Sequence, residues 1–204
     1  MGRPIQHDDR TRAVLLAVAE GLLDQAGIDA LSVRAVAHRA GTSTRAVYSL
    51  FGSKEGLLAM LAELGFNMLG DLVRRIPMTD DPIADLVVAA MHGFRAWTLE
   101  HPALYRLTFD RMMTGADADR RVTDAGRAAL EHLRVRVVRA AATGCLGGRD
   151  IDDVITEFHA LCEGIATVEL RGMLPPDNAE RLAHDAFEAL LRGMANPPTA
   201  RTHA

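Results

Sequence analysis

Several residue types are scarce in this sequence of 204 residues, and each scarcity narrows the class of protein. Two cysteines, Cys145 and Cys162, are too few for a disulfide framework and fit a reducing compartment. No apolar run reaches the roughly 18–20 residues that span a bilayer, and the first ten residues contain no apolar stretch of the signal-peptide kind. The sequence therefore predicts a cytoplasmic protein that makes no contact with a membrane.

Motifs that carry enzymatic chemistry are also missing from the sequence. It contains no Gly-x-Ser-x-Gly elbow, phosphate-binding loop or dinucleotide fingerprint. The eight histidines are scattered, and His159 has Cys162 and Glu163 one helical turn away, but two ligands do not make a metal site. We therefore expect no enzyme, no cofactor and no metal. The alternative is a small helical enzyme or metal-sensing protein that uses its first helices only as a scaffold.

The charge is distributed unevenly, although the net charge of −4 disfavours a nucleic-acid partner at first sight. Residues 1–54 carry seven basic and five acidic side chains, a balance of +2. The remainder carries 16 basic and 22 acidic side chains, a balance of −6. A basic end on an acidic body is the pattern expected when only one end of a protein contacts phosphates.

Apolar residues recur at three- and four-residue steps along the chain, and no segment alternates as a strand does. The predicted fold is all-α, with three closely spaced helices followed by six longer ones. Their predicted ranges are 9–26, 33–40, 44–51, 53–75, 82–100, 102–113, 119–143, 151–172 and 178–194. Gly27, Gly41, Pro82 and Gly144 supply the stop and start signals. We expect the tail 196–204 to be disordered.

The segment 33–52 has the pattern of a helix-turn-helix. Two short helices meet at Gly41, which can take the positive φ that the turn requires. One apolar face comes from Val33, Val36 and Ala37 and the other from Val47, Leu50 and Phe51. Hydroxyls and a guanidinium point outward, and these groups bond phosphates and base edges. A helical hairpin with a merely solvated face is the alternative.

This segment resembles the DNA-binding region of the TetR family. The resemblance lies in Val36-Ala37-x-x-Ala40-Gly41, Ala46-Val47-Tyr48-x-x-Phe51 and Ser53-Lys54-Glu55-x-Leu57-Leu58. It implies that 46–51 lies in the recognition helix, that Tyr48 contacts the DNA backbone and that Lys54 clamps a phosphate. The predicted DNA-binding residues are Arg34, Thr42, Ser43, Thr44, Arg45, Tyr48, Ser49 and Lys54, together with Arg3, either a minor-groove arm or a chance residue in a disordered terminus.

The resemblance implies a repressor with two domains. Residues 1–52 would form the DNA-binding domain, linked through helix 53–75, and 53–195 a six-helix domain for ligand binding and dimerisation. Its partners would be double-stranded palindromic operator DNA, a second copy of the chain, and a small hydrophobic or amphipathic effector that releases the DNA. Phe158, Glu163 and Gly164 also resemble, with substitutions, a subgroup that carries a Trp…His-Gly signature.

Aromatic residues and methionines gather between 94 and 113, where they either line a ligand pocket or fill a helix corner. The pocket candidates are Phe94, Trp97, Tyr105, Phe109, Met112, Met113, His159 and Glu163. The last two helices carry apolar stripes that serve either a dimer interface or the protomer's own core. The candidates for the interface are Ile155, Phe158, Cys162, Ile165, Ala183, Ala186, Phe187, Leu190 and Leu191.

Overall fold

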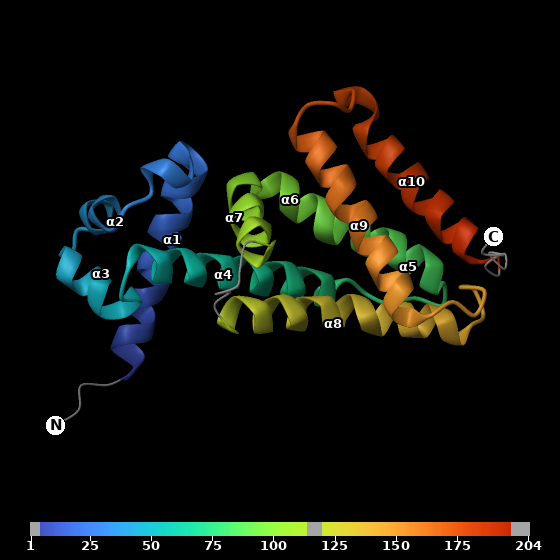
Figure 1. Ribbon diagram of the computed structural model, residues 1–204, viewed down its shortest axis with the longest axis horizontal. Helices are drawn as coiled ribbons and strands as arrows, with labels where there is room; N and C mark the ends of the chain where they lie inside the picture. Colours follow the sequence, from blue (N-terminus) through green and yellow to red (C-terminus); the bar gives the residue numbers. More distant parts are fainter. Residues whose placement is uncertain (1–4, 114–119, 197–204) are drawn as a thin grey trace, which may run out of the picture. The chain divides into compact units, whose positions relative to one another are not determined.

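Helices make up the regular secondary structure of the residues that the structure describes. The structure is a computed structural model that describes residues 5–113 and 120–196, with side chains over 10–109 and 120–196, and within these ranges it contains no strand. The elements are α1 (Ile5–Ala30), α2 (Val33–Arg39), α3 (Thr44–Phe51), α4 (Lys54–Arg75), α5 (Pro82–Val88), the π-helix η1 (Ala89–Arg95), α6 (Ala96–Glu100), α7 (Pro102–Met113), α8 (Arg120–Ala142), α9 (Ile151–Leu170), the 3-10 turn η2 (Pro176–Asn178) and α10 (Ala179–Met194) (Figure 1).

The predicted all-α fold and the order of the helices are confirmed. α5, η1 and α6 follow one another without a gap from Pro82 to Glu100, which matches the single helix predicted over 82–100. Asp81 caps this run, because its Oδ1 accepts hydrogen bonds from the backbone N–H groups of Ile83 (3.1 Å) and Ala84 (3.0 Å). The first helix differs from its prediction, since it continues to Ala30 through a non-helical break at Gly27 (φ 74°, ψ 179°).

The chain divides into two compact units, and each is described by itself. Unit 1 consists of Met1–Met68 and His101–Arg127, and unit 2 of Leu69–Glu100 and Ala128–Ala204. Their boundaries cross α4 and α8 and do not follow the predicted division into 1–52 and 53–195. The predicted division separates DNA binding from ligand binding and dimerisation, and it stays a prediction. Most of the predicted tail, 197–204, lies outside the described residues.

A buried carboxylate in unit 2 holds the connection between α4 and α5 against α8. Asp85 accepts hydrogen bonds from the backbone N–H and the hydroxyl of Thr79, and Arg139 Nη1 lies 2.6 Å from its Oδ2. Arg136, itself buried, donates from Nη2 to the carbonyls of Val73 (2.9 Å) and Ile76 (2.5 Å) at the end of α4. Backbone carbonyls at the C-terminal end of α4 thus bond to a cation from α8.

A second buried ion pair ties η1 to α9 within unit 2. Arg95 donates from Nε and Nη2 to the two carboxylate oxygens of Glu169, at 2.9 and 2.6 Å. Both side chains are mostly buried, with 16% and 12% of their surface exposed. This two-pronged geometry is the strong form of a guanidinium–carboxylate pair, so it fixes η1 in register against α9.

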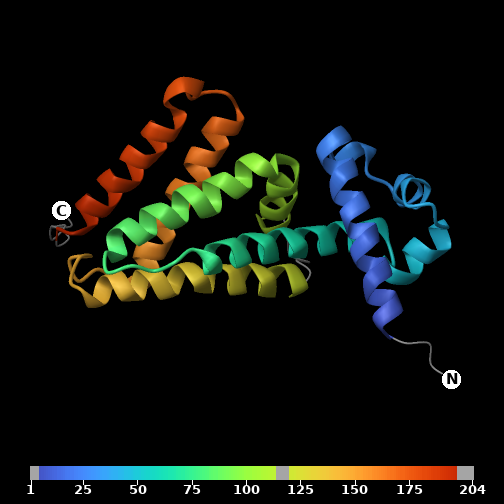
Figure 2. The same cartoon turned by 180° about the vertical axis from the view of Figure 1, so that it is seen from behind.

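The hairpin of α9 and α10 corrects the prediction for the dimer interface. The two helices lie side by side (Figures 1 and 2), and the rings of Phe158 and Phe187 meet at a centroid distance of 5.3 Å. Seven of the nine candidates are buried within the protomer, namely Ile155, Phe158, Cys162, Ile165, Ala183, Phe187 and Leu191. These stripes therefore pack in the protomer's own core, and only Ala186 and Leu190 remain half-exposed.

Two further expectations concern the cysteines and the longest apolar helix. Both cysteines are free thiols, with Cys162 buried and Cys145 half-buried, as the prediction of no disulfide requires. Burial raises the pKa of the Cys162 thiol well above its ordinary value. α4 is long and apolar enough to cross a membrane by length and composition, contrary to the expectation of no such run, but 56% of the apolar window is buried, as in the core helix of a soluble protein.

Candidate nucleic-acid interface

Three serines begin the helices of the candidate interface, which lies wholly within unit 1. Ser32, Ser43 and Ser53 each accept a hydrogen bond at Oγ from the backbone N–H three residues later, at 3.1, 3.2 and 3.0 Å respectively. Such caps satisfy backbone donors at a helix start that would otherwise lack a partner. The local sequence thereby sets where α2, α3 and α4 begin.

Glycines set the turns between these helices. Gly41 has φ 64° between α2 and α3, as predicted from the sequence, and Gly52 has φ 73° where α3 ends. At Gly56 the backbone of α4 approaches the end of α3 so closely that a Cβ would collide with the carbonyl oxygen of Phe51. The first turn of α4 can therefore lie directly against the end of α3. Lys54 is the first residue of α4, so it lies close to the end of α3.

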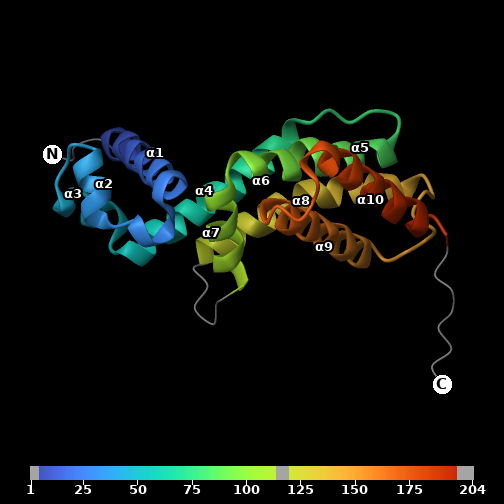
Figure 3. The ribbon, with the colours of Figure 1, turned by 90° about the horizontal axis from the view of Figure 1, so that it is seen from above.

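The helix pair buries the predicted apolar side chains. Val33, Val36 and Ala37 of α2 and Val47 and Phe51 of α3 are buried, whereas Leu50 is half-buried. Figure 3 shows α2 and α3 beside α1, whose Leu15, Ala19 and Leu23 are also buried. With its apolar face against this small core, α3 has its opposite face free for another molecule.

Most of the predicted DNA-binding residues lie on that exposed surface. Arg34, Thr42, Ser43, Thr44, Arg45, Tyr48 and Ser49 are exposed, Lys54 is half-buried, and Arg3 lies outside the described residues. Tyr48 is a large side chain with 52% of its surface exposed, so its ring and hydroxyl are accessible to another molecule. Ser43 has a second role that the sequence analysis missed, because its Oγ caps α3.

Charge on this segment has one sign only. Between Ala30 and Lys54 the sequence contains Arg34, Arg39, Arg45 and Lys54 but no aspartate or glutamate. Arg34, Arg39 and Arg45 are exposed. A run of this length without a carboxylate, in a chain of net charge −4, supplies an attractive potential for phosphate groups next to the outward face of α3.

The predicted pocket residues are divided between the two units. Phe94, Trp97, His159 and Glu163 belong to unit 2, whereas Tyr105 and Phe109 belong to unit 1. Phe94, Trp97, Tyr105 and Phe109 are buried, so they serve as core side chains in their own units, and the side chains of Met112 and Met113 lie outside the described residues. Within unit 1, the rings of Tyr105 and Phe109 lie 4.9 Å apart and those of Phe66 and Phe109 lie 5.4 Å apart.

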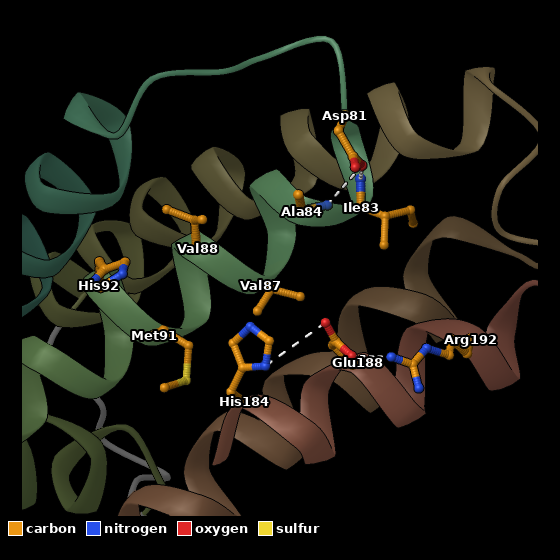
Figure 4. A pocket seen from close by; sticks show the side chains of 10 residues that line it. All are labelled: Asp81, Ile83, Ala84, Val87, Val88, Met91, His92, His184, Glu188 and Arg192. Carbon is orange, nitrogen blue, oxygen red and sulfur yellow. Dashed lines mark hydrogen bonds and ion pairs between the residues drawn. The ribbon is translucent and has the colours of Figure 1, made fainter. Parts of the chain in front are cut away.

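A pocket of about 280 Å³ lies elsewhere in unit 2, between α5, η1 and α10. None of the predicted pocket residues lines it. Figure 4 shows Val87 and Met91 on the side of α5 and η1, facing His184 and Glu188 on α10. Val87 and Met91 are almost fully buried, whereas His184 is exposed and Glu188 half-exposed, so an apolar floor meets a polar rim.

His159 lies in a mostly buried environment on α9. Its Nδ1 is 3.3 Å from Glu163 Oε1, and the ring of Phe94 meets its imidazole edge-on at 5.9 Å. Burial lowers the pKa of His159, and the Glu163 carboxylate opposes this shift only in part. Cys162, one turn from His159, is buried in the core.

The lowered pKa of His159 predicts acid sensitivity. As the pH falls below the ordinary histidine value of 6.5, the unfolded chain takes up a proton that the folded chain does not yet bind. The free energy of unfolding should therefore stay level above pH 6.5 and fall below it until the folded pKa is passed. Urea unfolding at pH 7.5, 6.5 and 5.5 measures this, and His159→Gln should reduce the slope. An identical slope in wild type and His159→Gln would contradict the assignment.

The fold and this surface define a class of protein, an all-α transcription regulator that binds DNA through a helix-turn-helix. Two family models match the chain: that of bacterial regulatory proteins of the tetR family over residues 15–61, and that of the tetracyclin repressor-like C-terminal domain over residues 87–194. The chain belongs to the TetR family. Members of this family are transcription regulators that bind DNA, typically as dimers with small-molecule effectors.

Relatives of this chain agree with that assignment. The HTH-type transcriptional regulator Rv1816 of Mycobacterium tuberculosis is 31% identical over 180 residues, which is 86% of this chain but 65% of that relative, so the match spans just under two thirds of its length. A structure of a protein with unknown function from Rhodococcus sp. RHA1 is 30% identical with a TM-score of 0.83, covering 91% of this chain and 95% of that one. The TetR regulator PfmR from Thermus thermophilus, 21% identical, shares the fold with a TM-score of 0.65 over 87% of this chain and 97% of its own.

Proposed function

We propose that this regulator is a repressor that binds a palindromic operator as a homodimer. The single observation that carries the proposal is the exposed face of α3, where hydroxyls, Tyr48 and Arg45 lie in a segment that contains cations and no carboxylate. Arg45 is the side chain suited to read a base edge, and Tyr48 and Lys54 are suited to hold phosphates. In the proposal Thr42, Ser43, Thr44 and Ser49 add hydrogen bonds to the DNA backbone or to bases, and Arg34 and Arg3 add cationic contacts.

A homodimer follows from the way such a short helix reads DNA. One recognition helix contacts a few base pairs, so useful specificity needs two half-sites about one helical turn apart. We place the interface on the outward face of α9 and α10, where Ala160, Gly164, Ala189 and Gly193 are exposed. A Cβ added at Gly164 or Gly193 would meet no atom within 4 Å in the protomer, so small side chains leave room for a second chain to approach closely.

We propose that the effector binds in unit 2, in the pocket between α5, η1 and α10. Its volume of about 280 Å³ is close to the smallest that ligand sites use, so the effector is a small molecule. Val87 and Met91 form an apolar floor and His184, Glu188 and Arg192 a polar rim, which suits an amphipathic compound. Binding would stabilise a conformation in which the two reading heads no longer fit successive major grooves. The Trp…His-Gly subgroup and the cytoplasmic location remain predictions.

Selection of bound DNA from a random pool tests the repressor proposal. We expect the pool to converge on an inverted repeat whose half-site centres lie about 10 base pairs, or a multiple of the helical repeat, apart. Binding should weaken steeply with salt, because phosphate contacts release counterions. A pool that stays random, or one that converges on a single unrepeated site, would contradict the proposal. The selected operator then serves as the probe for release by apolar and amphipathic compounds.

A further inference from the structure

A cluster of metal-binding side chains lies outside the candidate interface, where α1 packs against the start of α7 in unit 1. Glu20 and Asp24 lie one turn apart on α1, and His101 directly precedes α7. One donor atom from each of the three lies within 4.8 Å of the other two. Among the side chains that the structure describes, this is the one group of three such donors. It belongs to no part of the proposed function.

We propose that Glu20, Asp24 and His101 form a binding site for a divalent transition-metal ion. Glu20 Oε1 lies 3.4 Å from His101 Nδ1, which is the separation of two neighbouring ligand atoms around one metal ion. Zinc bonds of about 2.0–2.2 Å in tetrahedral geometry place neighbouring donors roughly 3.3–3.6 Å apart. Asp24 is exposed, so its carboxylate can rotate about its side-chain bonds and close the remaining gap without movement of the backbone.

The chemistry of the donor set selects the kind of ion. One imidazole and two carboxylates suit a borderline ion such as zinc, iron(II) or manganese(II). Calcium takes six to eight oxygen ligands, and soft copper(I) prefers thiolates or thioethers, so neither matches this set. Three protein ligands leave a fourth position for water, which reaches the site beside the exposed Asp24.

Electrostatics also favour a cation at this place. The side chains of Glu20 and His101 are only 20% and 19% exposed, so the repulsion between the Glu20 and Asp24 carboxylates is less screened there than on an open surface. A dication bonded to both carboxylates relieves this repulsion. The bound ion would join α1 to the residue that directly precedes α7 through three coordinate bonds.

Titration of chelator-treated, full-length protein with zinc tests the proposal. We expect one zinc per chain by calorimetry, and at a hundredfold excess over Kd a rise in melting temperature of roughly 5–10 °C. Asp24→Asn and His101→Gln should each weaken zinc binding at least tenfold. His132→Gln is the matched control, because it removes a half-buried histidine of α8 that belongs to no group of three donors among the described side chains. It should bind zinc as the wild type does.

The outcomes separate a metal site from a plain ion pair. If Glu20 and His101 serve only as an ion pair, His101→Gln will lower the melting temperature of the metal-free protein and leave zinc binding unchanged, which overturns the proposal. Absence of stoichiometric binding in the wild type overturns it as well. If the His101 variant fails to fold, Asp24→Asn still tests the proposal, because Asp24 is exposed and asparagine has nearly the same shape. Operator binding is not the readout, so the result is independent of the repressor proposal.

Discussion

Arg45→Ala and Lys54→Ala are expected to weaken operator binding in different ways. Removal of Arg45 should cost about 1–3 kcal/mol, or roughly 5–150-fold in Kd, for each half-site and only on the selected operator, because a guanidinium that reads a base edge carries sequence information. Removal of Lys54, or of Tyr48, should weaken binding to selected and random DNA alike. For Lys54 the slope of log K against log salt should fall by about 0.9 for each phosphate that the variant no longer neutralises.

Fluorescence polarisation on selected and scrambled duplexes at several salt concentrations measures both effects. Arg106→Ala is the matched control, since it removes an exposed cation from α7 in the same unit and should leave the ratio of selected to scrambled affinity unchanged. Melting temperatures should change little in the Arg45 and Tyr48 variants, because both side chains are exposed. Unaltered DNA binding in all three interface variants would refute the placement of the reading surface on α3.

Asp85→Ala should destabilise the protein by about 3 kcal/mol, because it removes the buried carboxylate that accepts hydrogen bonds from both Thr79 and Arg139. Only 5% of the Asp85 side chain is exposed, whereas 35% of Arg139 is exposed and can be rehydrated, so we expect the low end of the range for a broken buried pair. The melting temperature should fall by roughly 6–12 °C. Asp185→Ala, which breaks the exposed pair with Arg181, should cost less than about 1 kcal/mol.

Acid unfolding gives a second measure of Asp85. Burial pushes the pKa of Asp85 upward, but the hydrogen bonds from Thr79 and Arg139 outweigh it, so the pKa lies below its ordinary value of 3.8. The stabilisation is therefore complete above pH 3.8 and is lost as the pH falls through the folded pKa. The free energy of unfolding of Asp85→Ala should depend less on pH in that window than that of the wild type. Equal pH dependence would show that Asp85 does not hold the α4–α5 connection in this way.

The sequence predicted the helix-turn-helix well because its determinants are local. A serine cap, a glycine at positive φ and an apolar face within each short helix act over three or four residues, and all of them are visible in the order of the amino acids. The kink at Gly27 has the same origin. A helix end was predicted there, and the glycine does break the helix, although the chain resumes it for another three residues.

Predictions that depended on which surfaces meet were less successful. An apolar stripe with helical spacing looks the same whether it packs on the protomer's own helices or on a second chain, so the burial of Phe158 and Phe187 could not be assigned in advance. The cluster of Glu20 and Asp24 with His101 joins residues about 80 positions apart, and no local pattern signals it. The ion pair of Asp85 with Arg139 depends in the same way on α8 folding back against the α4–α5 connection.

The thiols of Cys145 and Cys162 differ in accessibility, so a thiol-reactive reagent can label one of them selectively. Cys162 is buried and its pKa is raised, so it has almost no thiolate to attack an electrophile, whereas Cys145, just beyond the end of α8, is partly exposed. These are the only cysteines in the chain. A maleimide dye or spin label applied to the unmodified protein will therefore attach once per chain, at Cys145, and distances between labels in an assembly can be measured without a single mutation.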